Sequence, residues 1–250
     1  KKDWGQQVRT FSVRSINECL LGYMKQLPGG KTRYESTRLF YAAYVNEENP
    51  KIDGILREAL NTRIVRRFLG YQGDSAMVEK QVYALWNVLQ KRKFRYSSVS
   101  YSSLSSNMVY SQRVRTFEDA LNSSQINCVD GSVLFASLLR AINITPVLVQ
   151  MPGHMFVGYY TDAQRKHLSF LETTMIGDVD LDDYFPEEKL DSTLMGKTQS
   201  QMSKLTFDKS KQYAMAEFKR VEKQVRENRP KYLFVEINKN VRRSVQSIGK

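Results

Sequence analysis

The chain has 250 residues, of which 41% are hydrophobic and 26% are charged, and its formal net charge is +12. This composition suits one large domain, or one domain with an appendage, and it excludes two classes of protein. Two cysteines cannot form a disulfide framework, and no apolar run reaches the roughly 18 residues that a membrane span needs. Because the cysteines and the two histidines show no paired ligand spacing, we expect no metal and no cofactor.

The first part of the chain carries no motif that points to chemistry. Its alternating and periodic apolar residues predict a strand over 6–16 and helices over 36–46 and 50–70. We therefore expect residues 1–75 to be an accessory segment or subdomain of mixed structure. Residues 76–250 are expected to form the main domain.

The main domain opens with a strongly periodic helix, predicted over 77–92, whose apolar stripe is typical of a core-facing helix. A serine-rich segment follows at 95–111 and predicts a strand and a polar loop. This loop is either a flexible surface segment or the wall of a cleft, and the sequence leaves both interpretations open.

The central block reads as two helices followed by three strands. Thr116 and Asp119 form a capping pattern for the first helix. The predicted elements after it are a helix over 128–141 and strands over 144–151, 154–160 and 167–174. A helix packed on an antiparallel sheet is an α+β arrangement, and this is the fold class that we predict.

The last part of the chain is divided by charge. An acidic loop at 178–188 carries Asp178, Asp180 and Asp182, which imitate part of a calcium loop but lack its glycine and distal glutamate. A long helix over 199–230 and a strand over 231–238 follow.

Residues 204–250 hold thirteen Lys and Arg against five Asp and Glu. This basic tail is either a solvated helix face or a surface for an anionic partner, and without a binding motif we do not expect nucleic acid.

Cys128 begins the predicted helix over 128–141. The first turn of a helix presents free N–H groups and a partial positive charge, which stabilise a thiolate. Asn127 is placed to cap this helix, and the same N–H groups can bind an oxyanion. The other cysteine, Cys19, lies among apolar residues and is expected to be buried.

His154 follows Pro152-Gly153 and opens a strand, so a constrained turn positions a candidate general base. Glu172 lies in the otherwise apolar run FLETT, where a carboxylate needs a partner. If residues i and j of the two strands pair with i + j = 326, His154 faces Glu172 directly, whereas at 327 they point to opposite faces, so a loop of odd length gives the productive register. The alternative is a solvent-exposed Glu172 at the sheet edge, and His167 in a polar turn is expected to be exposed.

The stretch NCVDGSVLFASLLRAINITPVLVQMPGHMFVGYY, followed by FLETT, resembles the bacterial branch of the transglutaminase-like superfamily of papain-type thiol enzymes. The resemblance rests on a Cys at a helix start, then a His after Pro-Gly, then an acid on the next strand. It covers residues 116–176, and more loosely the helix over 77–92. The family more often has Asp where this chain has Glu172.

The resemblance implies a papain/transglutaminase-like core with Cys128 as nucleophile, His154 as general base and acid, and Glu172 as the orienting group. An upstream side chain usually completes the oxyanion site in that family, and Gln125 is a candidate by its proximity in sequence. Asn127 is the second candidate for the oxyanion site or the cleft. The implied reaction is acyl transfer from an amide of a peptide or protein through an acyl-enzyme. A binding module without activity and a cross-linking transglutaminase are the alternatives. The first residue, Lys1, and the habits of the family lead us to expect an extracytoplasmic bacterial protein.

Overall fold

The structure, a computed structural model, describes residues 5, 7–9, 11, 13–98, 106, 108–177, 179–194 and 196–249. The fold is α+β, with a three-stranded and a four-stranded antiparallel sheet. The fold class predicted from the sequence is therefore confirmed at this level.

The four-stranded sheet is the centre of the molecule. Its strands are β6 (Pro146–Met151), β7 (His154–Tyr160), β8 (Leu168–Leu171) and β9 (Leu233–Glu236). They lie in the order β8-β7-β6-β9, with every neighbouring pair antiparallel. The chain thus builds most of this sheet from the consecutive strands that the sequence predicts, and adds a strand from near its end.

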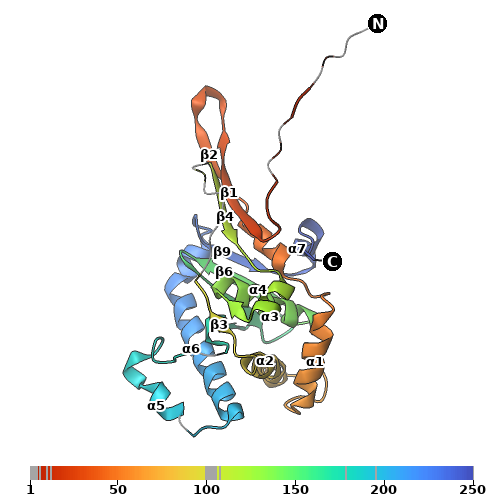
Figure 1. The fold of residues 1–250 in the computed structure, drawn as a ribbon, viewed down its shortest axis with the longest axis vertical. Coiled ribbons are helices and arrows are strands. Elements are labelled where there is room, and N and C mark those ends of the chain that lie inside the picture. Colours follow the sequence, from red (N-terminus) through yellow and green to blue (C-terminus); the bar gives the residue numbers. More distant parts are fainter. Residues whose placement is uncertain are drawn as a thin grey trace.

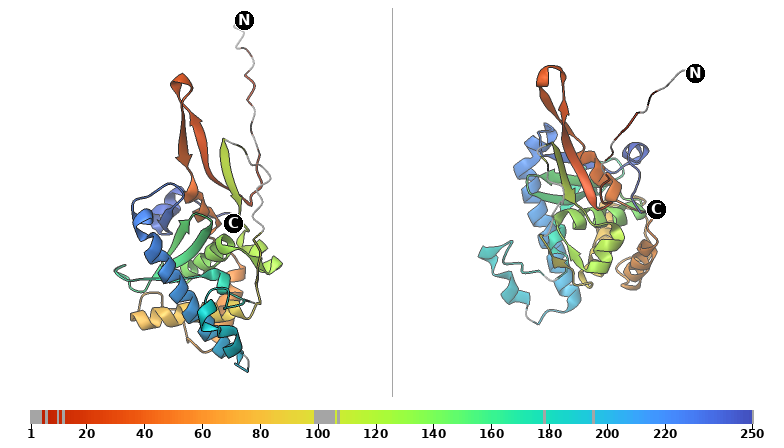
Figure 2. Two further views of the ribbon diagram at one scale, coloured as in Figure 1. Left: turned by 90° about the vertical axis from the view of Figure 1, so that its left-hand side faces the viewer. Right: turned by 45° about the horizontal axis from the view of Figure 1, so that its top comes forward.

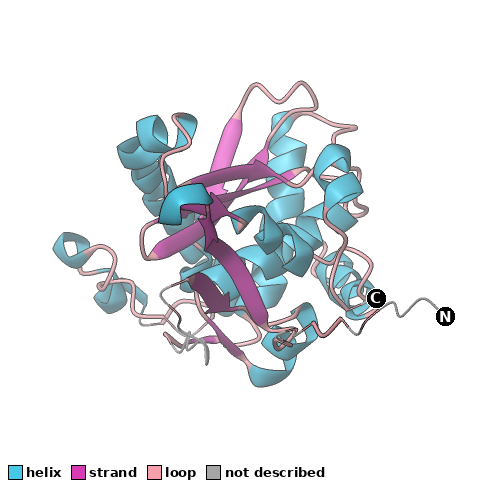
Figure 3. Ribbon diagram, turned by 90° about the horizontal axis from the view of Figure 1, so that it is seen from above, coloured by secondary structure: helices cyan, strands magenta, loops and turns pink. Residues whose placement is uncertain are grey.

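Helices cover both faces of this sheet, which lies between them when seen from above (Figure 3). The buried helix α4 (Cys128–Ala141) packs on β6 and β7, and the long helix α6 (Gln199–Arg226) packs on β8, β6 and β9. Successive side chains of a strand point to opposite faces of the sheet, so β6 contributes to the core on each face. Leu148 joins the core that contains α4, whereas Val147 and Val149 join the core that contains α6. Strands that are buried on both faces explain the continuous apolar run at this point of the sequence.

A second sheet projects from the body as a finger (Figures 1 and 2). Strands β1 (Glu18–Gln26) and β2 (Thr32–Ser36) form a hairpin around the 3-10 turn η1 (Pro28–Gly30). Strand β4 (Val109–Arg113) pairs with the other edge of β1, so the order is β2-β1-β4. This pairing links the N-terminal segment to a strand that lies shortly before the central block.

The remaining elements surround the two sheets. They are the 3-10 helices η2 (Arg38–Tyr44), η3 (Thr173–Met175) and η4 (Pro186–Glu188), the helices α1 (Lys51–Asn61), α2 (Ser75–Gln90), α3 (Phe117–Ser123), α5 (Leu190–Leu194) and α7 (Lys239–Ser244), and the short parallel pair β3 (Arg95–Tyr96) and β5 (Gln125–Ile126).

The predicted helices over 77–92, 128–141 and 199–230 are confirmed as α2, α4 and α6, with ends that differ by a few residues. Two other helices are shorter than predicted. The one over 36–46 is the 3-10 helix η2, and the one over 50–70 ends as α1 at Asn61. The helix ends there because Arg63 takes a left-handed backbone with φ of 60°.

The strand predicted over 6–16 is wrong for the residues of that range that the structure describes, which have no regular structure. The apolar residues that suggested it are 58% to 91% exposed, so the alternation faces no core. Of the serine-rich segment 95–111, residues 99–105 and 107 lie outside the described residues, as does Asp178 of the partial calcium pattern.

The division of the chain at residue 75 stays a prediction. In the described part of the chain, one buried cluster includes side chains from both sides of it, such as Tyr41, Ile55 and Trp86. Across the same described residues, every helix is too short or too polar to cross a lipid bilayer.

Helix α4 approaches η3 so closely that only glycine fits between them. A Cβ atom on Gly131 would lie 2.6 Å from Oγ1 and 2.9 Å from Cβ of Thr173. In the next position, Ser132 Oγ donates to the Cys128 carbonyl at 2.7 Å and lies 3.5 Å from Thr173 Oγ1. The first turn of α4 is therefore fitted directly against the segment that follows β8.

We predict that Gly131→Ala lowers the free energy of unfolding by about 1–3 kcal/mol, because the added methyl group overpacks this contact. Urea denaturation measures the change. Gly54→Ala is the matched control: Gly54 lies in the exposed interior of α1 with no atom within 4 Å of the added Cβ. There the substitution is expected to stabilise the protein slightly, by about 0.5–1 kcal/mol. Equal stability changes in the two variants would contradict the prediction.

Candidate active site

Cys128 is the first residue of α4, as the sequence predicts. Asn127 caps the helix: its Oδ1 accepts from the N–H groups of Val129 and Asp130, both at 2.9 Å. In return, the Asp130 carboxylate accepts from the Asn127 N–H at 3.2 Å, which completes a capping box. The position of the thiol is therefore fixed by a rigid helix start.

The Asp130 carboxylate has a second role in holding the helix start. It is fully buried and accepts from Nη1 of Arg115 at 2.6 Å and from the Arg115 N–H at 2.8 Å. A buried carboxylate is costly unless paired, and here an ion pair and backbone donors satisfy it. The motif CVDGS thus contains the candidate nucleophile Cys128, the capping-box partner Asp130 and the close contact of Gly131 within five consecutive residues.

His154 is positioned by the tight turn between β6 and β7. Met151 pairs with His154 across the hairpin, which leaves Pro152 and Gly153 as a two-residue loop. Gly153 has φ of 78°, and Pro followed by such a glycine is typical of a type II turn. His154 is therefore the first residue of β7, in the last pair of the β6–β7 hairpin before the turn.

Glu172 lies directly after β8 instead of within a strand, so the predicted strand 167–174 is too long. Its side chain is fully buried, which rules out the alternative of a solvent-exposed edge residue. Oε2 lies 2.5 Å from His154 Nε2, and Oε1 accepts from Thr174 Oγ1 at 2.7 Å and from the Thr174 N–H at 3.1 Å. The carboxylate is thus held from both sides and aimed at the imidazole.

The strand register explains how His154 and Glu172 meet. Strands β7 and β8 pair Val157 with Leu171 and Gly158 with Phe170, a sum of 328. The sum is even, as the productive register requires, but it is two larger than the predicted 326. The two side chains are therefore diagonal neighbours on the same face, a distance that long side chains can bridge.

The environment of His154 favours its charged form. Burial alone would lower the pKa of the imidazole, but hydrogen bonds to Cys128 and Glu172, and the charges of both groups, raise the pKa of His154 to about 10. Because Nε2 is engaged by Glu172, the nitrogen that remains for the sulfur is Nδ1. The structure therefore brings Cys128, His154 and Glu172 together in the order that an acyl-transfer triad needs.

A cavity of about 300 Å³ opens beside the thiol and the imidazole. Its described lining residues come from both sheets and from α4, and they are Leu21, Ser111, Gln112, Cys128, Val129, Gln150, Gly153 and His154. None of them carries a carboxylate, a lysine or an arginine. The space next to the sulfur therefore suits an uncharged group such as an amide.

Two residues that line this cavity carry candidate donors for an oxyanion, Cys128 with its backbone N–H and Gln112 with its side-chain amide. Among the described residues, no acceptor binds the backbone N–H of Cys128, because the cap serves Val129 and Asp130. The side-chain amide of Gln112 lines the cavity, and its oxygen already accepts from Tyr41 at 2.8 Å. Its NH2 group is therefore available to a ligand.

The residues that the sequence suggested for this role lie elsewhere. Gln125 is exposed in β5 and is not among the residues that line the cavity, because the pairing of β5 with β3 turns Ile126 inward instead. The Asn127 side chain is used as the helix cap. Gln112 was missed, since only the pairing of β4 with β1 brings it to the site.

Both cysteines are free, and Cys19 is buried as expected, with its pKa raised to about 12 by burial. His167 is exposed. In the described part of the basic tail, residues 204–249, at least seven of the twelve cationic side chains form ion pairs with carboxylates. An anionic partner for this tail stays a prediction.

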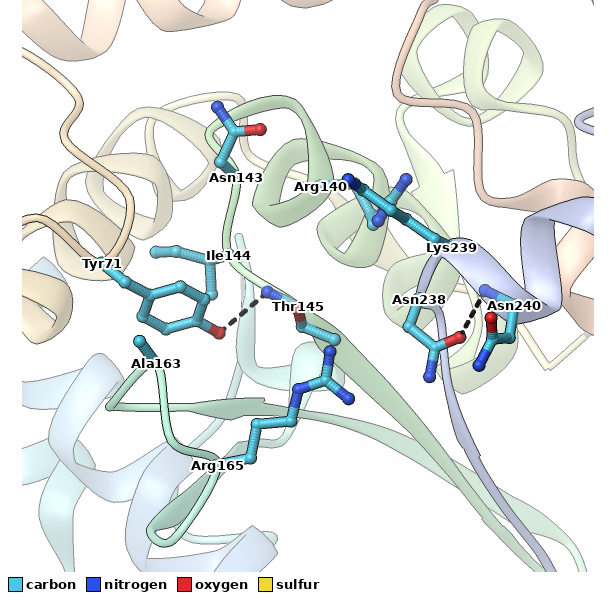
Figure 4. A pocket seen from close by; sticks show the side chains of 10 residues that line it. All are labelled: Tyr71, Arg140, Asn143, Ile144, Thr145, Ala163, Arg165, Asn238, Lys239 and Asn240. Atoms are coloured by element: carbon cyan, nitrogen blue, oxygen red, sulfur yellow. Dashed lines mark hydrogen bonds between the residues drawn. The ribbon is translucent and has the colours of Figure 1, made fainter.

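A larger cavity of about 510 Å³ lies at the other end of α4 (Figure 4). Arg140, Arg165 and Lys239 contribute charge to it, and Tyr71 accepts a hydrogen bond from the Thr145 N–H at 2.9 Å. Its lining holds no cysteine, histidine or carboxylate. The smaller cavity is therefore the one with the chemistry of an active site.

No protein-family model matches this chain, and no curated protein matches it. The function is therefore argued from the fold and from the geometry around Cys128.

We predict that the His154 imidazole titrates near pH 10 and that Glu172→Gln lowers this pKa, because the variant loses the charge that stabilises the imidazolium. NMR titration of the ring resonances measures both values, and the spectrum of His154→Gln assigns the signal. A titration of His154 near 6.5 in the unaltered protein would contradict the prediction.

The same shift makes stability depend on pH. The folded protein binds the imidazole proton more tightly than the unfolded chain, so this stabilisation is complete below about pH 6.5. It is lost as the pH rises towards about 10. Urea midpoints at the two pH values are therefore expected to differ more in the unaltered protein than in His154→Gln.

Proposed function

We propose that this protein is a thiol-dependent acyl-transfer enzyme that acts on an amide of a peptide or protein. The observation that carries the proposal is a helix-start cysteine that lines one cavity with an imidazole, which a buried carboxylate holds at 2.5 Å. We also propose that the helix α4 and its antiparallel sheet form a core of the papain and transglutaminase type. The order Cys, His and acid along the chain supports this assignment.

In the proposed reaction, the sulfur of Cys128 reacts as a thiolate beside the His154 imidazolium, whose charge Glu172 stabilises. The sulfur attacks the amide carbon, and the carbonyl oxygen becomes an anion that the Cys128 N–H and the Gln112 amide bind. The carbon–nitrogen bond then breaks as His154 gives its proton to the departing amine. A thioester on Cys128 remains.

The second step releases the acyl group. His154, now neutral, removes a proton from water, whose oxygen attacks the thioester, and the carbon–sulfur bond breaks. Attack by an amine in place of water would give a cross-link instead of a hydrolysed product. We favour hydrolysis, and cross-linking is the alternative outcome for the same acyl-enzyme.

A binding module without activity is the other alternative that the sequence left open. It would need the sulfur and the imidazole to lie apart, or the cleft to be closed. Cys128 and His154 line the same open cavity, and Cys128 is among the groups that raise the pKa of His154. These observations support the enzyme.

We predict that iodoacetamide labels Cys128 stoichiometrically at pH 7 and leaves Cys19 unlabelled, because Cys19 is buried and its pKa is about 12. Mass spectrometry of the digested protein identifies the labelled residue. Cys128→Ala is expected to abolish labelling, and His154→Gln to slow it at least about ten-fold, since the thiolate loses its counter-charge. Labelling at Cys19 alone would overturn the proposed function.

A further inference from the structure

Four side chains from three distant parts of the chain form a row of hydrogen bonds that ends at the candidate active site. Arg38 Nη1 donates to Gln150 Oε1 at 2.8 Å, and Gln150 Nε2 donates to the Tyr41 hydroxyl at 3.2 Å. The Tyr41 hydroxyl donates to Gln112 Oε1 at 2.8 Å. We refer to Arg38, Gln150 and Tyr41 as the relay, and Gln112 is the residue at its end.

The direction of every bond in this row follows from its first member. A guanidinium has donors and no acceptor, so the Gln150 oxygen must face Arg38 and its NH2 group must face Tyr41. The hydroxyl of Tyr41 has a single proton, which must then go to the oxygen of Gln112. The NH2 group of Gln112 is consequently left on the cavity side, and it has no acceptor among the described residues.

Burial makes the opposite orientation costly. Tyr41 is fully buried and Gln150 is 7% exposed, so neither can exchange a lost partner for bulk water. If the Gln112 amide were flipped, its NH2 group would face a hydroxyl whose proton has no other acceptor, and buried donors would oppose each other. The relay therefore fixes the rotamer of the Gln112 amide and its sense, in a position close to the thiol.

The relay is also close to the reacting sulfur. Tyr41 lies within electrostatic reach of Cys128, and both Gln150 and Gln112 line the same cavity as that residue. The relay comes from η2 and β6, whereas Gln112 comes from β4. The segments η2 and β6 contribute no reacting group, but they are thus connected through Gln112 to the proposed position of the oxyanion.

We propose that Arg38, Gln150 and Tyr41 are positioning residues that hold the Gln112 amide as a preorganised donor to the oxyanion. This inference rests on the proposed acyl-transfer function. It assigns a role to the N-terminal segment: η2 sets the direction of a donor on β4, which completes a site whose nucleophile stands on α4. Preorganised donors of this kind are among the largest contributions to catalysis of acyl transfer.

The test compares two reactions of the same thiol. Acylation by p-nitrophenyl acetate forms a sulfur–carbon bond and expels nitrophenolate through an anionic tetrahedral oxygen. Alkylation by iodoacetamide also forms a sulfur–carbon bond, but it expels iodide and creates no oxyanion. The rate of acylation relative to alkylation at Cys128 therefore reports the oxyanion donors and is insensitive to changes in thiol reactivity or folding.

We predict that Gln112→Met slows acylation about 100-fold, the loss typical of removing one oxyanion donor. Tyr41→Phe and Arg38→Met are expected to slow it about ten-fold, because the donor remains but loses its fixed direction. Alkylation is expected to stay near the unaltered rate in all three variants. Arg38→Lys keeps a donor without an acceptor at the start of the relay, and it is expected to preserve most of the acylation rate.

Tyr44→Phe is the matched control for Tyr41→Phe. Tyr44 lies on the same 3-10 helix, is also buried, and donates its hydroxyl to the Ile16 carbonyl at 2.9 Å, outside the relay. Both reactions are expected to proceed at the unaltered rate in this variant, even if its stability falls.

The possible outcomes separate the two proposals. A protein whose Cys128 reacts with neither reagent overturns the proposed function and this inference with it. Normal acylation in Tyr41→Phe and Arg38→Met, together with a reactive Cys128, overturns the relay alone. An equal loss of acylation and alkylation in these variants also overturns the relay, because it shows a purely structural role.

Discussion

The candidate site depends on the fixed start of α4. Asn127 and Asp130 close a capping box, and the buried Asp130 carboxylate is itself held by Arg115. Because the cap takes the N–H groups of residues 129 and 130, the N–H of Cys128 has no acceptor among the described residues. Gly131 then lets the segment that follows β8 approach the helix, since any side chain there would meet Thr173. One turn of helix therefore positions the candidate nucleophile and the candidate donor, and it leaves room for the segment that carries Glu172.

The buried Glu172 shows how the sheet serves this turn. Its burial would be unfavourable for an unpaired carboxylate, but His154 and Thr174 supply partners to both of its oxygens. Thr174 Oγ1 donates its proton to Glu172, so in its other contact it accepts from the Tyr184 hydroxyl, which lies 2.7 Å away. Ser210 of α6 holds the Glu172 backbone at 2.8 Å, so the helix on the far face of the sheet also fixes the acid. The position of the His154 imidazole therefore depends on helices on both faces of the sheet, because α6 holds the Glu172 backbone and α4 packs against the segment after β8.

The sequence predicted those parts of the site that are determined locally. The start of α4, the turn before His154 and the even register of Glu172 follow from capping, from Pro-Gly and from strand parity. The sequence did not predict the parts of the site whose position depends on pairing between strands that are distant along the chain. Gln112 reaches the cavity only because β4 pairs with β1, about 90 residues earlier. The described residues within 6–16 form no strand, although their apolar and polar residues alternate. Gln150 carried a usable signal, because a glutamine within the apolar run PVLVQM has to find a buried partner.

The geometry divides the proposed chemistry between two parts of the chain. The thiol, the imidazole and the acid come from residues 128–172, a compact unit in sequence. In the proposed reaction they supply the attacking sulfur and the proton for the departing amine. The environment of the developing negative charge comes from the finger sheet and η2, through Gln112, Tyr41 and Arg38. A positive charge at the far end of a buried row of dipoles orients each amide without placing an ion in the cavity, which stays neutral apart from the catalytic pair. In the proposed reaction, a cavity without carboxylate, lysine or arginine favours binding of an uncharged amide, and the oriented Gln112 donor stabilises its transition state.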